Sequence, residues 1–280
     1  MKKVIVPTDF SDNAYNALVY AVKLLQDEKC TFFLLNTYTP TIYQPEYLIH
    51  SPGQIGLGDV YQENSATQLE QTKKRIEMEH PNDKHTFVTH AAFNMLVQEI
   101  EYMVLSEGAD LVVMGTQGAT GAQEVFLGTN TVHVLKKVDC PVIAVPSGFD
   151  FNAPKKILFP TDYEIAFAKK PLRLLLDIAA HHTSHINILH VVSGYGPSKE
   201  QQENKDKLAQ LLTGMDHTTH EWPDQTVIAA INGFQQDHGM DLLVMVQNKH
   251  TFFERLFVEP VIKKIGFHTT VPFMVMPYRE

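Results

Sequence analysis

The stretch KKVIVPTDF at residues 2–10 decides the fold, because a near copy of it, KKILFPTDY, stands at residues 155–163. A short run of valine, isoleucine or leucine without polar alternation is typical of a strand that is buried on both faces, and the threonine and aspartate after it indicate a turn. The same strand and turn are therefore expected once in each half of the chain.

Two further blocks repeat in the same order. DLVVM at residues 110–114 returns as DLLVM at residues 241–245, and PVIAVP at 141–146 returns as PFMVMP at 272–277. Because repeats of solenoid proteins are only about 20 to 50 residues long, this much longer period indicates a duplicated domain.

The spacing of the blocks locates the difference between the two copies. The first block is shifted by 153 positions and the later ones by 131, so the second copy lacks residues in its middle. The first copy has a matching excess, rich in proline, glycine and tyrosine, at residues 38–61, which we expect to be a long loop. We expect two domains, residues 1–148 and 154–280.

Apolar runs alternate with amphipathic stretches in both copies, which is typical of parallel strands joined by helical crossovers. Expected strands of the first copy lie near 3–7, 31–36, 85–90, 110–114 and 141–145, and its helices near 12–26, 60–79, 93–107 and 129–137. Expected strands of the second copy lie near 156–159, 185–191, 217–221, 241–246 and 272–276. The fold class is therefore α/β, with two tandem Rossmann-like domains, each a five-stranded parallel sheet with helices on both faces.

Ligands of such sheets bind beyond the carboxyl ends of the strands, where the strand order reverses. After the fourth strand of the first copy comes GTQGATG at residues 115–121, followed by GTN at 128–130 at the start of a helix. Glycines let backbone amides approach phosphate oxygens, and the helix start favours an anion. Thr129 can donate to such a phosphate, or it can simply cap the helix.

The spacing Gly115-x2-Gly118-x9-Gly128-Thr129 is identical to the nucleotide motif G-2x-G-9x-G-(S/T) of the universal stress protein family. Residues 4–11, VIVPTDFS, also resemble the first strand of that family and its acidic residue. The resemblance covers nearly the whole chain in two copies. It implies two tandem adenine nucleotide alpha hydrolase-like domains and a stress-response regulator that binds ATP, ADP or AMP, with Mg²⁺ as a further component.

The resemblance also implies a set of binding residues in the first copy. Asp9 would lie beside adenine and ribose, although a helix cap is an equally good interpretation of Asp9 or Ser11. Thr37 would line the base pocket. The complete implied set is Pro7, Thr8, Asp9, Thr37, Met114, Gly115, Gly118, Gly128, Thr129 and Asn130.

Two departures from the motif limit this expectation. The loop from Thr116 to Thr129 contains no basic residue but does contain Glu124, so charge on a triphosphate would need Mg²⁺ or backbone amides. In the second copy the positions of the motif hold Val246, Lys249, Glu259 and Pro260. We therefore expect one nucleotide site for each chain.

Composition excludes several classes of function. The formal net charge of the 280 residues is −9 and neither half has a surplus of lysine and arginine, which disfavours nucleic acid as a partner. No stretch is apolar enough to span a membrane, and the acidic start does not resemble a signal peptide, so we expect a cytoplasmic protein. Cys30 and Cys140 lie in apolar runs and are expected to be buried free thiols.

Other sites are weaker hypotheses. His181, His182, His185 and His190, like His217 and His220, could bind zinc, but no cysteine or carboxylate completes a ligand set. No residue pattern indicates a catalytic nucleophile, and no catalytic or metal-binding residue is assigned. Weak ATP hydrolysis or adenylate transfer, and a scaffold that binds no nucleotide, remain alternatives.

Partners are implied mainly by the resemblance. The last strands of the two copies, 142–145 and 273–276, have apolar edges and are expected to pair in an intrachain pseudo-dimer. Two chains would then form a homodimer, and an unknown regulatory protein would respond to the nucleotide. The aromatic segment 252–257 is a candidate interface.

Overall fold

The computed structural model describes residues 1–38, 55–116, 128–192, 196–223, 226–247 and 270–278, and of residues 55–59 only the backbone. The described residues form two compact units. The first unit ends at Cys140 and the second begins at Pro141.

The first unit has four parallel strands in the order β3-β2-β1-β4. Its elements along the chain are β1 (Lys2–Pro7), α1 (Asp12–Leu24), β2 (Cys30–Thr37), α2 (Ile55–Glu79), β3 (His85–Ala92), α3 (Leu96–Ser106), β4 (Leu111–Gly115) and α4 (Thr129–Lys137). The strand order reverses at β1, which has β2 on one side and β4 on the other.

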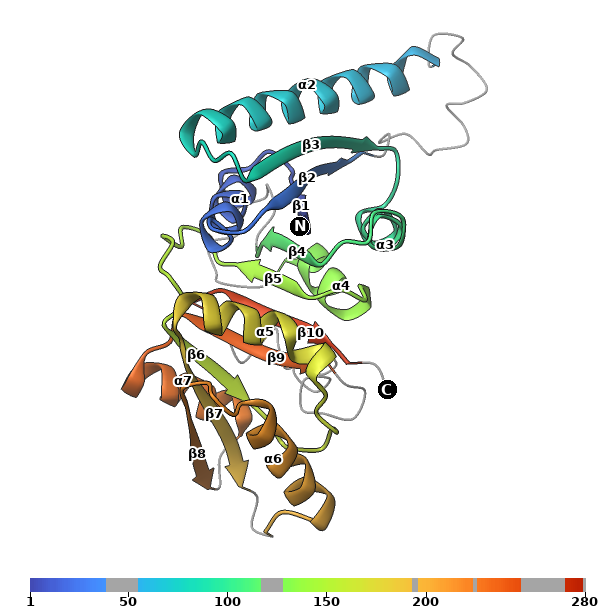
Figure 1. Cartoon of the computed structure of the whole chain (residues 1–280). Coiled ribbons are helices and arrows are strands. Elements are labelled where there is room, and N and C mark those ends of the chain that lie inside the picture. The colour runs from blue at the N-terminus through green and yellow to red at the C-terminus, as the bar shows by residue number, and fades with distance from the viewer. Residues whose placement is uncertain (39–54, 117–127, 193–195, 224–225, 248–269, 279–280) are drawn as a thin grey trace. The chain divides into compact units, whose positions relative to one another are not determined.

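Helices cover both faces of these strands. Figure 1 shows α1 and α3 on opposite sides of the sheet, and α2 running along β3. α1 contacts β1 and β4, whereas α3 contacts β1 and β2 and packs against α4. Helices therefore cover both faces of the central strands, which explains why Val4, Ile5 and Val112 are fully buried.

The second unit has six strands in the order β5-β10-β9-β6-β7-β8. Its elements are β5 (Val142–Val145), β6 (Lys156–Pro160), α5 (Lys169–His182), β7 (His185–Val192), α6 (Lys199–Leu211), β8 (His217–Pro223), α7 (Val227–His238), β9 (Leu242–Gln247) and β10 (Phe273–Pro277). β10 runs parallel to β9 and antiparallel to β5, with Met274 opposite Ile143. The expected pairing of the last strands of the two copies is confirmed.

The duplication extends to individual hydrogen bonds. The backbone N–H of Lys3 donates to Oδ2 of Asp110 at 2.8 Å, and that of Lys156 donates to Oδ2 of Asp241 at 2.8 Å. In return, the amides of the two aspartates donate to the carbonyls of the two lysines, again at 2.8 Å in each copy. This fixes the start of the first strand against the start of the fourth strand in both units.

One boundary differs from the sequence prediction. α2 begins at Ile55, five residues before residue 60, so the end of the loop expected at 38–61 is helical. The GLG sequence at residues 56–58 resembles the start of a dinucleotide-binding glycine motif, which lies in a turn between a strand and a helix. Here GLG lies within α2, so it does not form such a turn. Residues 39–54 lie outside the described part of the chain.

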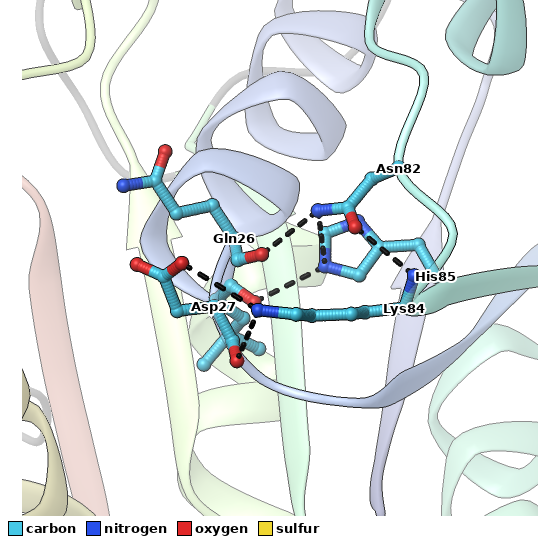
Figure 2. Close-up of polar contacts among 6 residues, drawn as sticks. Gln26, Asp27, Asn82, Lys84 and His85 are labelled. Atoms are coloured by element: carbon cyan, nitrogen blue, oxygen red, sulfur yellow. Dashed lines mark hydrogen bonds and ion pairs between the residues drawn. The ribbon is translucent and has the colours of Figure 1, made fainter.

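A polar cluster joins β3 to the end of α1, at the amino ends of the strands (Figure 2). The side chain of Asn82 donates to the carbonyl of Gln26 at 2.8 Å, and Lys84 forms an ion pair with Asp27 at 3.7 Å. Nε2 of His85 lies 3.1 Å from the carbonyl of Leu25, a distance at which the ring N–H donates to that oxygen. Among the described residues, the buried Nδ1 of the same ring has no hydrogen-bond partner.

Both cysteines are buried free thiols, as predicted. Burial raises the pKa of Cys30 to about 11 and that of Cys140 to about 12. Within the described ranges, no helix has the length and apolar character needed to cross a bilayer.

Candidate functional site

A pocket of about 200 Å³ lies in the first unit at the carboxyl ends of β1, β2 and β4, where the strand order reverses. The first turn of α4 and Leu96 of α3 complete its wall. Its lining residues are Pro7, Thr8, Asp9, Ala14, Asn36, Thr37, Leu96, Met114, Gly115, Gly128, Asn130 and Thr131.

The turn after β1 is held in a fixed shape. The amide of Thr8 continues the sheet by donating to the carbonyl of Leu35 at 2.8 Å, and the amide of Phe10 donates back to Oγ1 of Thr8 at 2.9 Å. Phe10 has a φ of 66°, which is uncommon for a residue other than glycine. This reversal brings Asp9 to the mouth of the pocket.

Asp9 is exposed, and its carboxylate bonds the residue that caps α1. Its Oδ1 accepts hydrogen bonds from the amide of Ser11 at 3.1 Å and from the Ser11 hydroxyl at 2.6 Å. Ser11 is the N-cap of α1 and accepts from the amide of Ala14 at 3.2 Å. Asp9 therefore orients the cap, and it is also the charged residue that lines the pocket.

Asn36 is a lining residue that sequence reasoning missed. Its Nδ2 donates to the carbonyl of Thr8 at 2.7 Å, and its Oδ1 accepts from the hydroxyl of Ser65 at 2.7 Å. Ser65 belongs to α2 and is buried. A single side chain thus ties the end of β2 to the turn after β1 and to the crossover helix.

Gly115 ends β4 in contact with α1. A Cβ at this position would lie 2.8 Å from Cγ of Asn13 and 3.1 Å from its carbonyl oxygen, closer than side chains pack. The carbonyl of Gly115 accepts from the hydroxyl of Thr131 at 2.9 Å, and Thr131 is buried. A glycine is therefore required where β4 borders the pocket.

The first turn of α4 presents its backbone to the same pocket. Gly128 is the N-cap residue and makes no side-chain cap, and its amide donates to the carbonyl of Thr116 at 2.5 Å. The cap role considered for Thr129 is therefore wrong, since Thr129 is the first residue of the helix. The amides of the first helical turn have no acceptor within the helix, so this end favours an anion.

Of the implied binding residues, eight line this one pocket: Pro7, Thr8, Asp9, Thr37, Met114, Gly115, Gly128 and Asn130. Thr129 is exposed and is absent from the lining, and Gly118 lies outside the described residues. Ala14, Asn36, Leu96 and Thr131 line the pocket although no motif marked them. Of these four, Asn36 could have been identified from the sequence, because it is a polar residue at the end of an apolar strand.

In the described part of the second unit, several side chains near the corresponding strand ends are buried. Tyr163 takes the place of Phe10, with a φ of 57°, and is 1% exposed. Ile165 and Phe167, which follow it before α5, are buried, as is Val246, which corresponds to Gly115. Thr161, the counterpart of Thr8, is only 7% exposed. Lys249, Glu259, Pro260 and the segment 252–257 lie outside the described residues.

The histidines of the second unit make separate polar contacts. Nδ1 of His190 lies 3.0 Å from the carbonyl of Thr161, so the buried imidazole replaces Asn36 in tying two strand ends together. His185 pairs with Asp216 at 2.9 Å, and Nε2 of His220 lies 3.0 Å from Oδ1 of Asn187. Across the described ranges, no three histidine, cysteine or acidic side chains come together as a metal site.

Comparison with known proteins places the chain in a family. Residues 1–146, more than half of the 280, match the model of the universal stress protein family. The chain belongs to the universal stress protein family. Its similarity extends to universal stress protein MJ0577 of Methanocaldococcus jannaschii, which is 31% identical over 158 residues, covering 51% of this chain and 94% of that protein.

A second relative is universal stress protein MJ0531 of the same organism, 27% identical over 147 residues, covering 51% of this chain and 81% of that protein. Among solved structures, a universal stress protein from Archaeoglobus fulgidus superposes over the length of both chains. It is 18% identical, with a TM-score of 0.67, and the match covers 99% of this chain and 97% of that one. This likeness supports the tandem Rossmann-like α/β fold.

Proposed function

We propose that the first unit binds an adenine nucleotide, ATP, ADP or AMP, and that the protein is a stress-response regulator with one such site per chain. The observation that carries this proposal is that three separate segments holding residues of the implied binding set line one pocket. These segments are the turn at residues 7–9, the end of β4 at 114–115, and Gly128 and Asn130 at the start of α4.

Each wall of the pocket suits a different part of the ligand. Met114 and Leu96 offer apolar surface to a base. The carboxylate of Asp9 accepts hydrogen bonds, as a ribose hydroxyl requires. The amides in the first turn of α4 have no acceptor within the helix and suit a phosphate, because they combine hydrogen-bond donors with the positive end of the helix dipole.

The charge of the lining residues determines how much each nucleotide depends on Mg²⁺ for binding. The charged lining residue is the acidic Asp9, and no lysine or arginine lines the pocket in the described part of the chain. A triphosphate would therefore need Mg²⁺ to offset its charge, whereas AMP needs less compensation. We expect ATP to bind more tightly with Mg²⁺ than without it.

The same lining argues against efficient phosphoryl transfer. Such chemistry normally uses a cation on the phosphates and a residue that orients the nucleophile, and the described lining offers only Asp9, at the mouth of the pocket. Weak hydrolysis stays an alternative for the ATP-bound protein, and a scaffold role is the alternative if no nucleotide binds.

Calorimetric titration of the full chain with ATP, ADP, AMP and cAMP, each with and without Mg²⁺, tests the proposal. The wild type is expected to bind one adenine nucleotide per chain. Gly128→Glu would place a carboxylate at the helix start and should abolish binding. His133→Glu adds the same charge to an exposed position of α4 outside the lining and should bind normally. No binding by the wild type would contradict the site and favour the scaffold.

The remaining proposals concern organisation. We propose that residues 1–148 and 154–280 are the two domains, that the chain forms a homodimer, and that a regulatory protein responds to the bound nucleotide. A cytoplasmic location stays a prediction from the sequence. Sedimentation of the purified chain with and without ATP tests the dimer.

A further inference from the structure

Three histidines of the second unit lie at one face of β7 and β8, near the end of α7. Leu189 of β7 lies opposite His220 of β8 in the parallel pairing, so the two side chains point to the same face. Because side chains alternate along a strand, His185 and Asn187 share that face. His238 is in the last turn of α7, and its ring centre lies 5.9 Å from that of His220. The end of α7 therefore lies over this face.

Ring contacts hold α7 against β8. Phe234 of α7 is fully buried, and its ring centre lies 5.0 Å from that of His220 and 4.7 Å from that of His238. Trp222, two residues after His220 on the same face, has its ring centre 6.0 Å from that of Phe234. A Cβ at Gly233 of α7 would lie 3.0 Å from the Trp222 ring. The imidazole of His220 is therefore part of the packing between helix and strand.

The surroundings of His220 favour its neutral form. Nε2 lies 3.0 Å from Oδ1 of Asn187, which only accepts hydrogen bonds, so the ring N–H is at Nε2. Among the described residues, no hydrogen bond reaches Nδ1 of this ring, so a proton added there finds no acceptor. Burial lowers the pKa of His220, and positive charge on His238 and His185 lowers it further.

Negative charge to balance three protonated imidazoles is scarce at this face. Asp216 lies 2.9 Å from Nδ1 of His185 and pairs with that ring. Lys156 donates to the backbone carbonyl of His238 at 2.9 Å and so adds positive charge at the end of α7. Protonation of His220 and His238 would therefore place two cations side by side without a carboxylate between them.

The other titratable groups of the two strands lie on the opposite face. They alternate with His185 and His220 along β7 and β8, and Glu221 pairs with Lys205 of α6 at 2.6 Å. Asp237 of α7 is exposed, so solvent and salt screen its charge. The groups on the opposite face are His190 of β7 and His217 and Glu221 of β8.

We propose that the contact between α7 and β8 is an acid-sensitive switch, in which protonation of His220 and His238 loosens α7 from the sheet and opens the rings of Phe234 and Trp222 to water. The unfastened ring of His220 takes up its proton below a pH of about 6.5. The contact is therefore complete above that pH and weakens as the pH falls through the lowered pKa of His220. This device belongs to the second unit and does not depend on the proposed nucleotide site.

Trp222 is the only tryptophan of the 280 residues, so its fluorescence reports on this contact in the full chain. Between pH 7.5 and pH 5 its emission should move to longer wavelength, and acrylamide should quench it more strongly. The far-ultraviolet circular dichroism should keep most of its helical signal over the same range. Constant emission, or a change that coincides with loss of the helical signal of the whole chain, would overturn the proposal.

Matched variants assign the effect to the histidines. His220→Gln keeps an N–H donor for Asn187 and removes the titration, so the acid shift of Trp222 should be lost. His217→Gln, on the opposite face of β8, should shift as the wild type does. If His220→Gln already changes the emission at pH 7.5, His238→Gln at the exposed end of α7 serves the same purpose. An acid shift of wild-type size in both His220→Gln and His238→Gln would refute the switch.

Discussion

Gly115 shows how a motif glycine can be required by packing before any ligand is considered. Its missing Cβ leaves room for Asn13 of α1, while its carbonyl is held by Thr131. The glycine motif read from the sequence predicted close approach of a phosphate, but the structure shows that the neighbour at Gly115 is α1. This contact could not be predicted from the spacing of the glycines.

Gly115→Ala is expected to lower the free energy of unfolding by about 1–3 kcal/mol, because the added methyl group would overlap Asn13 in a closely packed contact. Urea unfolding followed by circular dichroism measures this difference. Gly196→Ala is the control, since none of the described residues lies within 4 Å of a Cβ there. Equal stability of the two variants would contradict the packing role.

His85 should make the protein less stable in acid. Burial lowers the pKa of His85, and its Nδ1 has no acceptor among the described residues, so the folded state resists protonation. The unfolded chain takes up this proton below a pH of about 6.5, and stability therefore falls as the pH drops from about 6.5 through the lowered folded pKa.

His85→Gln keeps an N–H donor and removes the titration. Its stability between pH 7.5 and pH 5.5 should fall less than that of the wild type, whereas His133→Gln, at an exposed position, should behave as the wild type does. Thermal unfolding midpoints at the two pH values measure the effect. An identical loss in all three proteins would exclude His85 as the cause.

The two cysteines should be inert in the folded protein. Their raised pKa values keep both thiols protonated at neutral pH, and both side chains are buried. An aromatic disulfide reagent at pH 8 is expected to react with neither thiol in the native state and with two after unfolding. Rapid reaction of either one would contradict this arrangement.

At the scale of the element, the crossover helices α2 and α6 distinguish the two halves. α6 begins with a capping box in which Ser198 and Gln201 bond each other, and its Asn204 donates to the carbonyl of Tyr163 in the turn after β6. α2 is much longer, and it ties to the first unit through Ser65, whose hydroxyl donates to Oδ1 of Asn36 at 2.7 Å. The spacing of the repeats predicted that the copies differ in this region. No sequence motif marks Gln201 and Asn204, whose side chains donate to the turn after β6.

Asn204→Leu is expected to destabilise the second unit by about 1–3 kcal/mol, because the buried carbonyl of Tyr163 would lose its donor. Gln210→Leu makes a similar change at an exposed position of the same helix and should have little effect. The unfolding midpoint in urea separates the two outcomes. A loss of the same size in both variants would show that the hydrogen bond is unimportant.

At the scale of the whole molecule, the sequence predicted the repeated strands and their parallel order. These predictions are confirmed, because they depend on apolar runs that are visible in sequence. Eight of the ten residues implied for the nucleotide site line one pocket. Asn36 and Thr131 could not be assigned, since their roles arise from long-range contacts with Thr8 and Gly115. The early start of α2 was missed because its first residues include two glycines, Gly56 and Gly58, which are unfavourable in a helix.

The central claim is that one adenine nucleotide binds to the first unit and none to the second. Photolabelling with 8-azido-ATP and Mg²⁺, followed by mapping of the labelled peptides, tests it most directly. The account predicts saturable labelling within peptides that contain residues 7–10, 37 or 114, which unlabelled ATP displaces. Labelling centred on Thr161–Tyr163 or Val246 of the second unit, or label that excess ATP does not displace, would contradict it.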